Sequence, residues 1–180
     1  MSTYISLLRG INLGGNKPVK MERLRALFES LGYAQVRTYI NSGNVIFNGK
    51  KLSTSALSRK LEKEIEREFG FPVPVITKTA EEIARTLDRN PFVKEKGIDA
   101  TKLHVTFLWQ APAPAALQKV EGLALGSDRF VCCECDVYLY CPNGYSQTVL
   151  ANNTLQRLLG TGATTRNWKT VNKLYEISRA

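Results

Sequence analysis

Apolar residues in the first half of the chain switch between strand-like and helix-like spacing. Short apolar runs predict strands at Tyr4–Leu8, Val36–Ile40, Asn44–Phe47 and Val73–Thr77. Apolar residues three or four positions apart, each series followed by a glycine, predict helices at Lys20–Leu31 and Thr54–Phe69. The order β-α-β-β-α-β is that of a ferredoxin-like plait.

The same order recurs in the second half, after a short helix at Thr79–Asp88 and a connector over residues 89–100. Strands are expected at Lys102–Leu108, Arg129–Cys133, Val137–Cys141 and Ala163–Arg166. Helices are expected at Pro114–Val120, Leu150–Leu159 and Asn167–Ser178. The sequence therefore predicts an α+β protein of two tandem plaits with antiparallel sheets, over residues 1–78 and 79–180. One larger mixed sheet, or a single plait with appendages, remains an alternative.

Two polar, glycine-containing loops of the first plait are expected to converge. Residues 9–20 follow the first strand, and residues 41–44 join the second and third strands. In a plait with sheet order 4-1-3-2, the first and third strands are neighbours, and these two loops lie at the same edge. The corresponding loops of the second plait, residues 109–112 and 134–136, lack the glycines and the positive charge. A binding site is therefore expected on the first plait.

The residue types in these loops favour an anionic ligand. Glycines let backbone N–H groups turn toward an anion, a helix N-terminus follows, and three cations add positive charge. A nucleoside triphosphatase loop is rejected, because the lysine is displaced by one position and no Ser or Thr follows it. The alternative is that the glycines only shape a long loop and asparagines cap its backbone. The predicted ligand-binding residues are Arg9, Gly10, Asn12, Gly14, Gly15, Lys17, Lys20, Asn41, Ser42, Gly43 and Asn44.

The composition of the chain bears on its partner, through the net charge, and on its location in the cell. The net charge is +9, and the first fifty residues carry seven Lys or Arg against two Glu. This bias favours an anionic small molecule or nucleic acid as partner, although a solvated basic surface would look the same. No apolar run is long enough to span a bilayer, and the N-terminus lacks signal-peptide features. A cytoplasmic protein without membrane contact is therefore expected, with its four cysteines reduced.

No catalytic or cofactor signature is present. The spacing of Cys132, Cys133, Cys135 and Cys141 is not that of a zinc site, so neither a metal nor a cofactor is expected. His104 is the only histidine and has no evident nucleophile or carboxylate partner. The catalytic residues are therefore unknown, and the sequence does not decide whether the chain is an enzyme.

The last helix begins with a basic segment. Arg166 precedes the expected N-cap Asn167, and Trp168 is favoured as a core residue over a base-stacking one. Arg166 and Asn167 are further ligand-binding candidates. Whether this segment joins the site on the first plait stays open.

Long motifs link the chain to a known family. They lie at Leu7–Gly15, Val19–Met21, Arg37–Val45 and Thr165–Leu174. Together they resemble an uncharacterised, mainly bacterial family of domains of unknown function, number sixteen-ninety-seven. The resemblance runs nearly end to end and implies two α-β plaits, but no activity and no catalytic residues. Residues 16–18 differ from the more basic stretch of that family, and the cysteines lie outside its pattern.

Three functions are consistent with these features. The leading hypothesis is binding of a phosphate-bearing ligand, either a nucleotide-like metabolite or nucleic acid, at the first plait. RNA recognition on the sheet face is disfavoured, because Asn44–Phe47 lacks the required aromatic pattern. The alternatives are an enzyme that acts on a small anionic substrate and a protein-interaction scaffold. The oligomeric state is not predicted.

Overall fold

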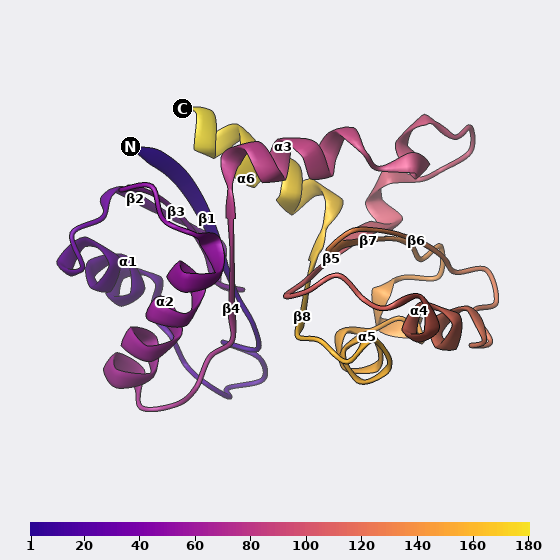
Figure 1. Cartoon of the computed structure of the whole chain (residues 1–180), viewed down its shortest axis with the longest axis horizontal. Helices are drawn as coiled ribbons and strands as arrows, with labels where there is room; N and C mark the ends of the chain where they lie inside the picture. The colour runs from indigo at the N-terminus through magenta and orange to yellow at the C-terminus, as the bar shows by residue number, and fades with distance from the viewer. The chain divides into compact units, whose positions relative to one another are not determined.

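Two four-stranded antiparallel sheets form the framework of the protein, as the computed structural model of residues 1–180 shows (Figure 1). The first sheet has the order β2-β3-β1-β4 and the second the order β6-β7-β5-β8. The strands of the first are β1 (Ser2–Leu8), β2 (Ala34–Tyr39), β3 (Asn44–Gly49) and β4 (Val75–Thr79). Those of the second are β5 (Leu103–Leu108), β6 (Arg129–Cys133), β7 (Asp136–Tyr140) and β8 (Ala163–Asn167). Both orders are those of a ferredoxin-like plait, so the predicted fold is confirmed.

Each sheet has its own pair of helices. The first pair is α1 (Met21–Ser30) and α2 (Thr54–Phe69), and the second is α4 (Pro114–Glu121) and α5 (Asn152–Leu159). The remaining helices are α3 (Ala80–Asp88) and α6 (Trp168–Arg179), and short 3-10 turns occupy Pro91–Lys94, Ala100–Lys102 and Tyr145–Gln147. None of these helices is long and apolar enough to cross a membrane.

The chain forms two compact units, each of which makes most of its residue contacts within itself. The first unit comprises Met1–Ala84 and Lys173–Ala180, and the second comprises Arg85–Asn172. The predicted division of the sequence at residue 78 stays a prediction.

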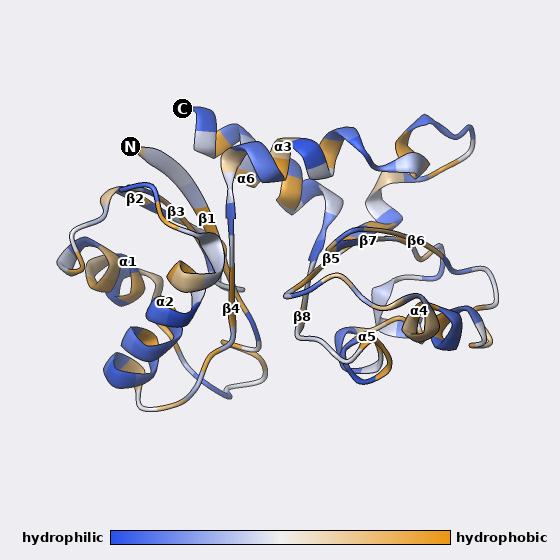
Figure 2. Cartoon of the chain, in the orientation of Figure 1, coloured by the Kyte–Doolittle hydropathy of each residue, from blue (hydrophilic) through white to orange (hydrophobic).

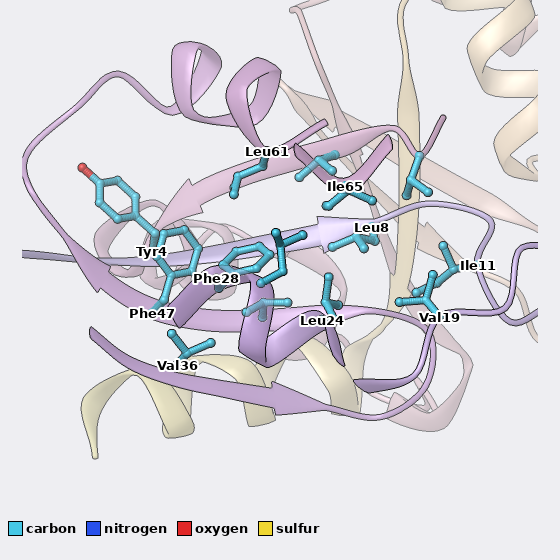
Figure 3. Close-up of a cluster of buried hydrophobic side chains, with 14 of the residues drawn as sticks. Tyr4, Leu8, Ile11, Val19, Leu24, Phe28, Val36, Phe47, Leu61 and Ile65 are labelled. Carbon is cyan, nitrogen blue, oxygen red and sulfur yellow. The ribbon is translucent and has the colours of Figure 1, made fainter. Parts of the chain in front are cut away.

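The core of the first unit lies between its sheet and α1 and α2. The sheet contributes Tyr4, Leu8 and Phe47, and the rings of Tyr4 and Phe47 stack with centroids 5.6 Å apart. Figure 3 shows Phe28 of α1 and Leu61 of α2 packed on this face, and Figure 2 shows the lower part of β4 in the hydrophobic colours. Full burial of such side chains stabilises the fold by about 1.5–3 kcal/mol each.

In the second unit, α4 and α5 cover one face of the sheet. Val120 of α4 and Leu155 of α5 pack in one cluster with Leu139 of β7. On β7, Tyr138 donates a hydrogen bond of 2.7 Å from its hydroxyl to the carbonyl oxygen of Thr86 in α3. The Thr86 hydroxyl in turn donates to the Asp136 carboxylate at 2.6 Å. These bonds hold the C-terminal end of α3 against β7.

The two plaits anchor their first strands in the same way. In each, the last strand residue donates its backbone N–H to the turn between the second and third strands, and the next residue donates to the segment before the fourth strand. The pairs are Leu8 to Gly43 and Arg9 to Pro74, at 2.8 and 3.0 Å, and Leu108 to Cys135 and Trp109 to Gly162, at 2.8 and 3.0 Å. The correspondence extends to hydroxyl pairs that join the first and fourth strands, Ser6 with Thr77 and Thr106 with Thr165.

Candidate functional site

The loop over residues 9–20 has two buried apolar anchors and a left-handed backbone between them. Ile11 and Val19 are almost fully buried and lie beside Leu8 (Figure 3). Between them, the backbone N–H of Asn12 donates to the carbonyl of Lys17 at 3.1 Å, which closes the loop on itself. Positive φ angles occur at Gly10, Asn12, Gly14, Gly15 and Lys17. The glycines therefore shape this loop, because such angles strain most other residues.

Asn12 joins the two polar loops of the first plait. Its amide nitrogen donates to the carbonyl of Val19 at 2.9 Å and to the carbonyl of Asn41 at 2.8 Å. Its amide oxygen accepts the backbone N–H of Val19 at 2.8 Å. The loops thus meet at one edge of the sheet, as topology predicted. Both donor hydrogens of the Asn12 amide are used within the protein, so its main role is to hold the loops together.

The turn between β2 and β3 is held by two residues of the predicted set. Asn44 is fully buried, and its amide donates to the carbonyl of Tyr39 at 2.8 Å and to the Ser42 hydroxyl at 3.1 Å. Gly43 has a φ of +87°, and a Cβ atom there would lie 2.6 Å from Ile11 Cδ1 and 2.8 Å from Leu8 Cβ. Gly43 therefore lets the turn approach the end of β1, and both residues serve the structure of the edge.

A hollow of about 520 Å³ opens beside this junction, at the start of α1. The residue before the helix, Lys20, makes no side-chain cap, so the first N–H groups of α1 lack a capping acceptor from it. The hollow is lined by Asn12, Pro18, Val19, Lys20, Met21, Glu22 and Asn41. A helix N-terminus carries a partial positive charge, which favours an anion at this position.

The charged groups at the hollow are few. Lys20 is exposed and makes no ion pair, and Glu22 on the same rim carries the opposite charge. Two neighbouring cations are occupied elsewhere. The Lys17 ammonium donates to the carbonyl of Pro72 at 2.6 Å, and Arg23 pairs with Glu68 at 2.7 Å. Among the residues that line the hollow, Lys20 is the one cation.

The hollow includes only part of the predicted site. Asn12, Lys20 and Asn41 line it. The predicted residues outside its lining are Arg9, Gly10, Gly14, Gly15, Lys17, Ser42, Gly43 and Asn44. Pro18, Val19, Met21 and Glu22 also line the hollow, although the sequence pattern predicted only loop and helix positions for them. These four residues directly flank the start of α1, and the absence of a capping residue type at position 20 was the one sequence signal that could have indicated them.

Arg166 and Asn167 lie in β8, in the second unit. The Asn167 side chain accepts the backbone N–H of Thr170 at 2.8 Å, so Asn167 caps α6 as predicted. The Arg166 guanidinium donates to the carbonyl of Thr165 at 3.0 Å, and burial lowers the pKa of Arg166 to about 10. A ligand-binding role for these two residues stays a prediction.

The cysteines of the second unit occupy two different environments. Cys132 and Cys135 pack against the hydrophobic cluster of α4 and α5, whereas Cys133 lies beside Arg89. Cys135 lies in the turn between β6 and β7. No group of three or more His, Cys, Asp or Glu side chains is arranged to hold a metal ion.

Comparisons with known proteins place the fold but assign no activity. A family described as "Protein of unknown function (DUF1697)" matches residues 1–138. The solved structure of the conserved bacterial protein SP0830 from Streptococcus pneumoniae is similar over 100% of this chain and 99% of that chain, with 26% sequence identity and a TM-score of 0.80. Among curated proteins, none matches this sequence. The structural similarity therefore extends over both plaits.

Proposed function

The chain belongs to the family of proteins of unknown function DUF1697, and from that premise we propose that it binds a small phosphate-bearing metabolite in the hollow at the start of α1. The observation that carries this proposal is the hollow itself, which combines a helix start without a capping side chain, an unpaired lysine and an exposed asparagine. Its volume of about 520 Å³ lies within the range of small-molecule sites.

Phosphate is favoured over other groups because of the donors around the hollow. The first N–H groups of α1 point out of the helix end, where a phosphate oxygen can accept them. Lys20 supplies a flexible ammonium, and the Asn41 side chain makes no hydrogen bond within the chain and offers an amide donor. Hydrogen bonds that involve a charged group are about twice as strong as neutral ones.

A small metabolite is favoured over nucleic acid because of the local charge. Nucleic-acid binding without base recognition depends on several Lys or Arg side chains that neutralise successive phosphates. The hollow has one lysine, and Glu22 on the same rim repels any further negative charge. Pro18, Val19 and Met21 add an apolar wall for the remainder of the ligand, such as a nucleobase.

The enzyme alternative would centre on Glu22. Among the lining residues, it is the side chain able to accept a proton from a substrate as a general base. The binding and enzyme hypotheses predict opposite effects of Glu22→Gln. Simple binding of a phosphate should improve when the repelling carboxylate is removed, whereas turnover by a general base should be lost.

A calorimetric and thermal-shift comparison of charge variants tests the proposal. Phosphate, adenosine monophosphate and glucose 6-phosphate serve as probes for the full chain. We expect Lys20→Gln to weaken binding by about 1.5–3 kcal/mol, because a charge-assisted hydrogen bond is lost. Lys63→Gln is the matched control, since Lys63 is also exposed and unpaired but lies on α2, outside the hollow lining. Equal effects of both variants, or no response of the native protein to any probe, would overturn the proposal.

A further inference from the structure

We propose that Ile40 determines which phosphate-bearing ligand the hollow accepts, and that this ligand carries an aromatic or apolar group, as a nucleoside phosphate does. The inference rests on the proposed binding of phosphate at the start of α1, and it names the class of molecule bound there. It is based on two exposed apolar side chains, Ile40 in the turn between β2 and β3 and Leu13 in the loop over residues 9–20.

The backbone of Ile40 has a conformation that β-branched residues rarely adopt. Its φ angle is +50°, in the left-handed region, where glycine and asparagine are the usual residues. The Ile40 carbonyl accepts the backbone N–H of Gly43 at 3.4 Å, and a residue of any type could provide this acceptor. The chemistry of the turn alone would therefore favour Asn or Gly at position 40.

The fold gains little from the side chain of Ile40. This side chain is 47% exposed and does not belong to the hydrophobic cluster of the first unit. Leu13 is 64% exposed and is also outside that cluster. A single exposed apolar residue is ordinary on a protein surface, but one that also strains the backbone is not explained by stability. Strained backbone of this kind is concentrated at functional sites.

Both exposed apolar residues are next to residues that line the hollow. Ile40 directly precedes Asn41, and Leu13 directly follows Asn12. The Asn12 amide donates to the carbonyl of Asn41 at 2.8 Å, so Ile40 and Leu13 flank the junction of the two loops. Each is one residue, or about 3.8 Å between Cα atoms, from the lining. A ligand whose phosphate lies at the helix start can therefore extend toward Ile40.

The chemistry around the hollow favours a phosphate ester with an aromatic or apolar group. The start of α1 and Lys20 offer donors to the phosphate, whereas Ile40 and Leu13 offer apolar surface to the remainder of the ligand. An aromatic base placed against these side chains removes apolar surface from water, which favours binding. The hydroxyl groups of a sugar phosphate would instead lose hydrogen bonds to water there without gaining partners.

Calorimetry of the full chain with adenosine monophosphate and ribose 5-phosphate tests the inference, because the two probes differ only by the base. The native protein should bind adenosine monophosphate roughly tenfold more tightly. Ile40→Asn removes the apolar side chain and introduces a residue that tolerates the positive φ. It should abolish most of this preference by weakening adenosine monophosphate alone, whereas Ile40→Val should keep most of it. The melting temperature of Ile40→Asn should stay the same or rise, because the strain is relieved.

A matched control and the pattern of failure separate this inference from the proposed function. Leu52→Asn changes another exposed apolar residue of the first unit, outside the hollow lining, and should alter neither affinity. If neither probe binds, the phosphate site is wrong and the inference falls with it. If both probes bind equally, or if Ile40→Asn leaves the preference unchanged, the phosphate site stands and the assigned ligand class is overturned. A clear fall in the melting temperature of Ile40→Asn would show that this side chain serves the fold and would contradict its assigned role.

Discussion

The corresponding edge of the sheet carries a ligand-sized hollow in the first plait and a thiol beside an arginine in the second. Both edges are held by the same backbone hydrogen bonds, from Leu8 to Gly43 and from Leu108 to Cys135. The difference lies in the connecting segments. The first plait has a long loop pinned by Asn12, whereas the second has a short connection after Trp109 and a tight turn. The topology thus fixes where the edge lies, and the connecting residues determine which chemistry it carries.

The net charge of each unit is a poor guide to this difference. The first unit holds fifteen Lys or Arg against nine Asp or Glu, a net of +6, and the second holds ten against seven, a net of +3. The hollow of the more basic unit nevertheless has one cation and one carboxylate in its lining, Lys20 and Glu22. The excess positive charge lies elsewhere, on exposed and unpaired side chains such as Lys51 and Arg59.

The largest loss of folding stability is expected from a substitution at Gly43, where the edge of the first plait is most tightly packed. Gly43→Ala should destabilise the protein by about 2–4 kcal/mol, because a left-handed residue gains a Cβ that collides with Ile11 and Leu8. Chemical denaturation measures this loss. Gly15→Ala is the control, since Gly15 also has a positive φ, of +80°, but has no atom near the new Cβ. Its cost should be only about 1 kcal/mol. Similar losses of stability for the two variants would show that the contacts of the new Cβ with Ile11 and Leu8 do not add to the cost of the positive φ.

The second plait also has a crowded glycine at this edge, Gly162, which corresponds in position to Pro74 of the first plait. A Cβ at Gly162 would lie 2.3 Å from the ring of Trp109, closer than any contact at Gly43. The Trp109 side chain is only partly buried, so it can move away where Ile11 and Leu8 cannot. Gly162→Ala should therefore cost less stability than Gly43→Ala and should shift the tryptophan fluorescence. A larger loss of stability in Gly162→Ala than in Gly43→Ala would show that the edge of the second plait is the less tolerant of an added side chain.

Much of the fold could be predicted because its signals are local. Gly70 and Gly160 end their helices in the left-handed conformation, and Asn167 caps α6, as their neighbours in the sequence indicate. The strand order of the plait was enough to predict that residue 12 lies near residue 41. These inferences need only the chain order and the spacing of apolar residues.

The role of each site residue could not be predicted in the same way. Lys17 resembled an anion-binding residue, but its ammonium is bound to the carbonyl of Pro72, which lies far along the chain. Asn44 resembled a surface residue of a polar turn, but it is fully buried and binds the carbonyl of Tyr39. Which partner a polar side chain finds depends on side-chain packing, and residue type and spacing do not encode it.

A smaller effect is expected from the hydroxyl pairs that join the first and fourth strands. In the first plait, Ser6 and Thr77 form an isolated pair at 2.8 Å, and Ser6 is fully buried. Thr77→Val should cost about 1–3 kcal/mol, because it leaves the Ser6 hydroxyl buried without a partner. Combining it with Ser6→Ala should recover most of this loss, since no buried hydroxyl then remains in the pair.

The second plait should respond differently to the same treatment. There the Thr165 hydroxyl bonds both to Thr106 and to the side chain of Asn152. Replacing both threonines by valine still leaves the Asn152 amide without its partner, so the double variant should not recover the stability of the native protein. Double-mutant cycles from urea denaturation measure both cases. Equal recovery in the two plaits would show that Asn152 contributes nothing to the pair.

The smallest expected effect is a pH dependence that only the second plait carries. The first strands of the two plaits hold aromatic residues at equivalent positions, Tyr4 and His104, and only the histidine titrates near neutral pH. Burial lowers the pKa of His104 below its ordinary value of 6.5, and its ring stacks on Tyr145 with centroids 4.9 Å apart. The unfolded chain therefore binds a proton at His104 at a higher pH than the folded chain does.

The sign of the effect follows from this difference in proton binding. The contribution of the neutral ring to stability is complete above the ordinary pKa and is lost as the pH falls below it. Between about pH 7.5 and pH 5, the free energy of unfolding of the native protein should thus fall more steeply than that of His104→Gln. Carboxylates contribute equally to both proteins, so the difference between the two curves isolates the histidine. Tyr4→Phe, the matched change in the first plait, should leave the slope unchanged. Parallel curves for the native protein and His104→Gln would mean that His104 is protonated equally in the folded and unfolded chains.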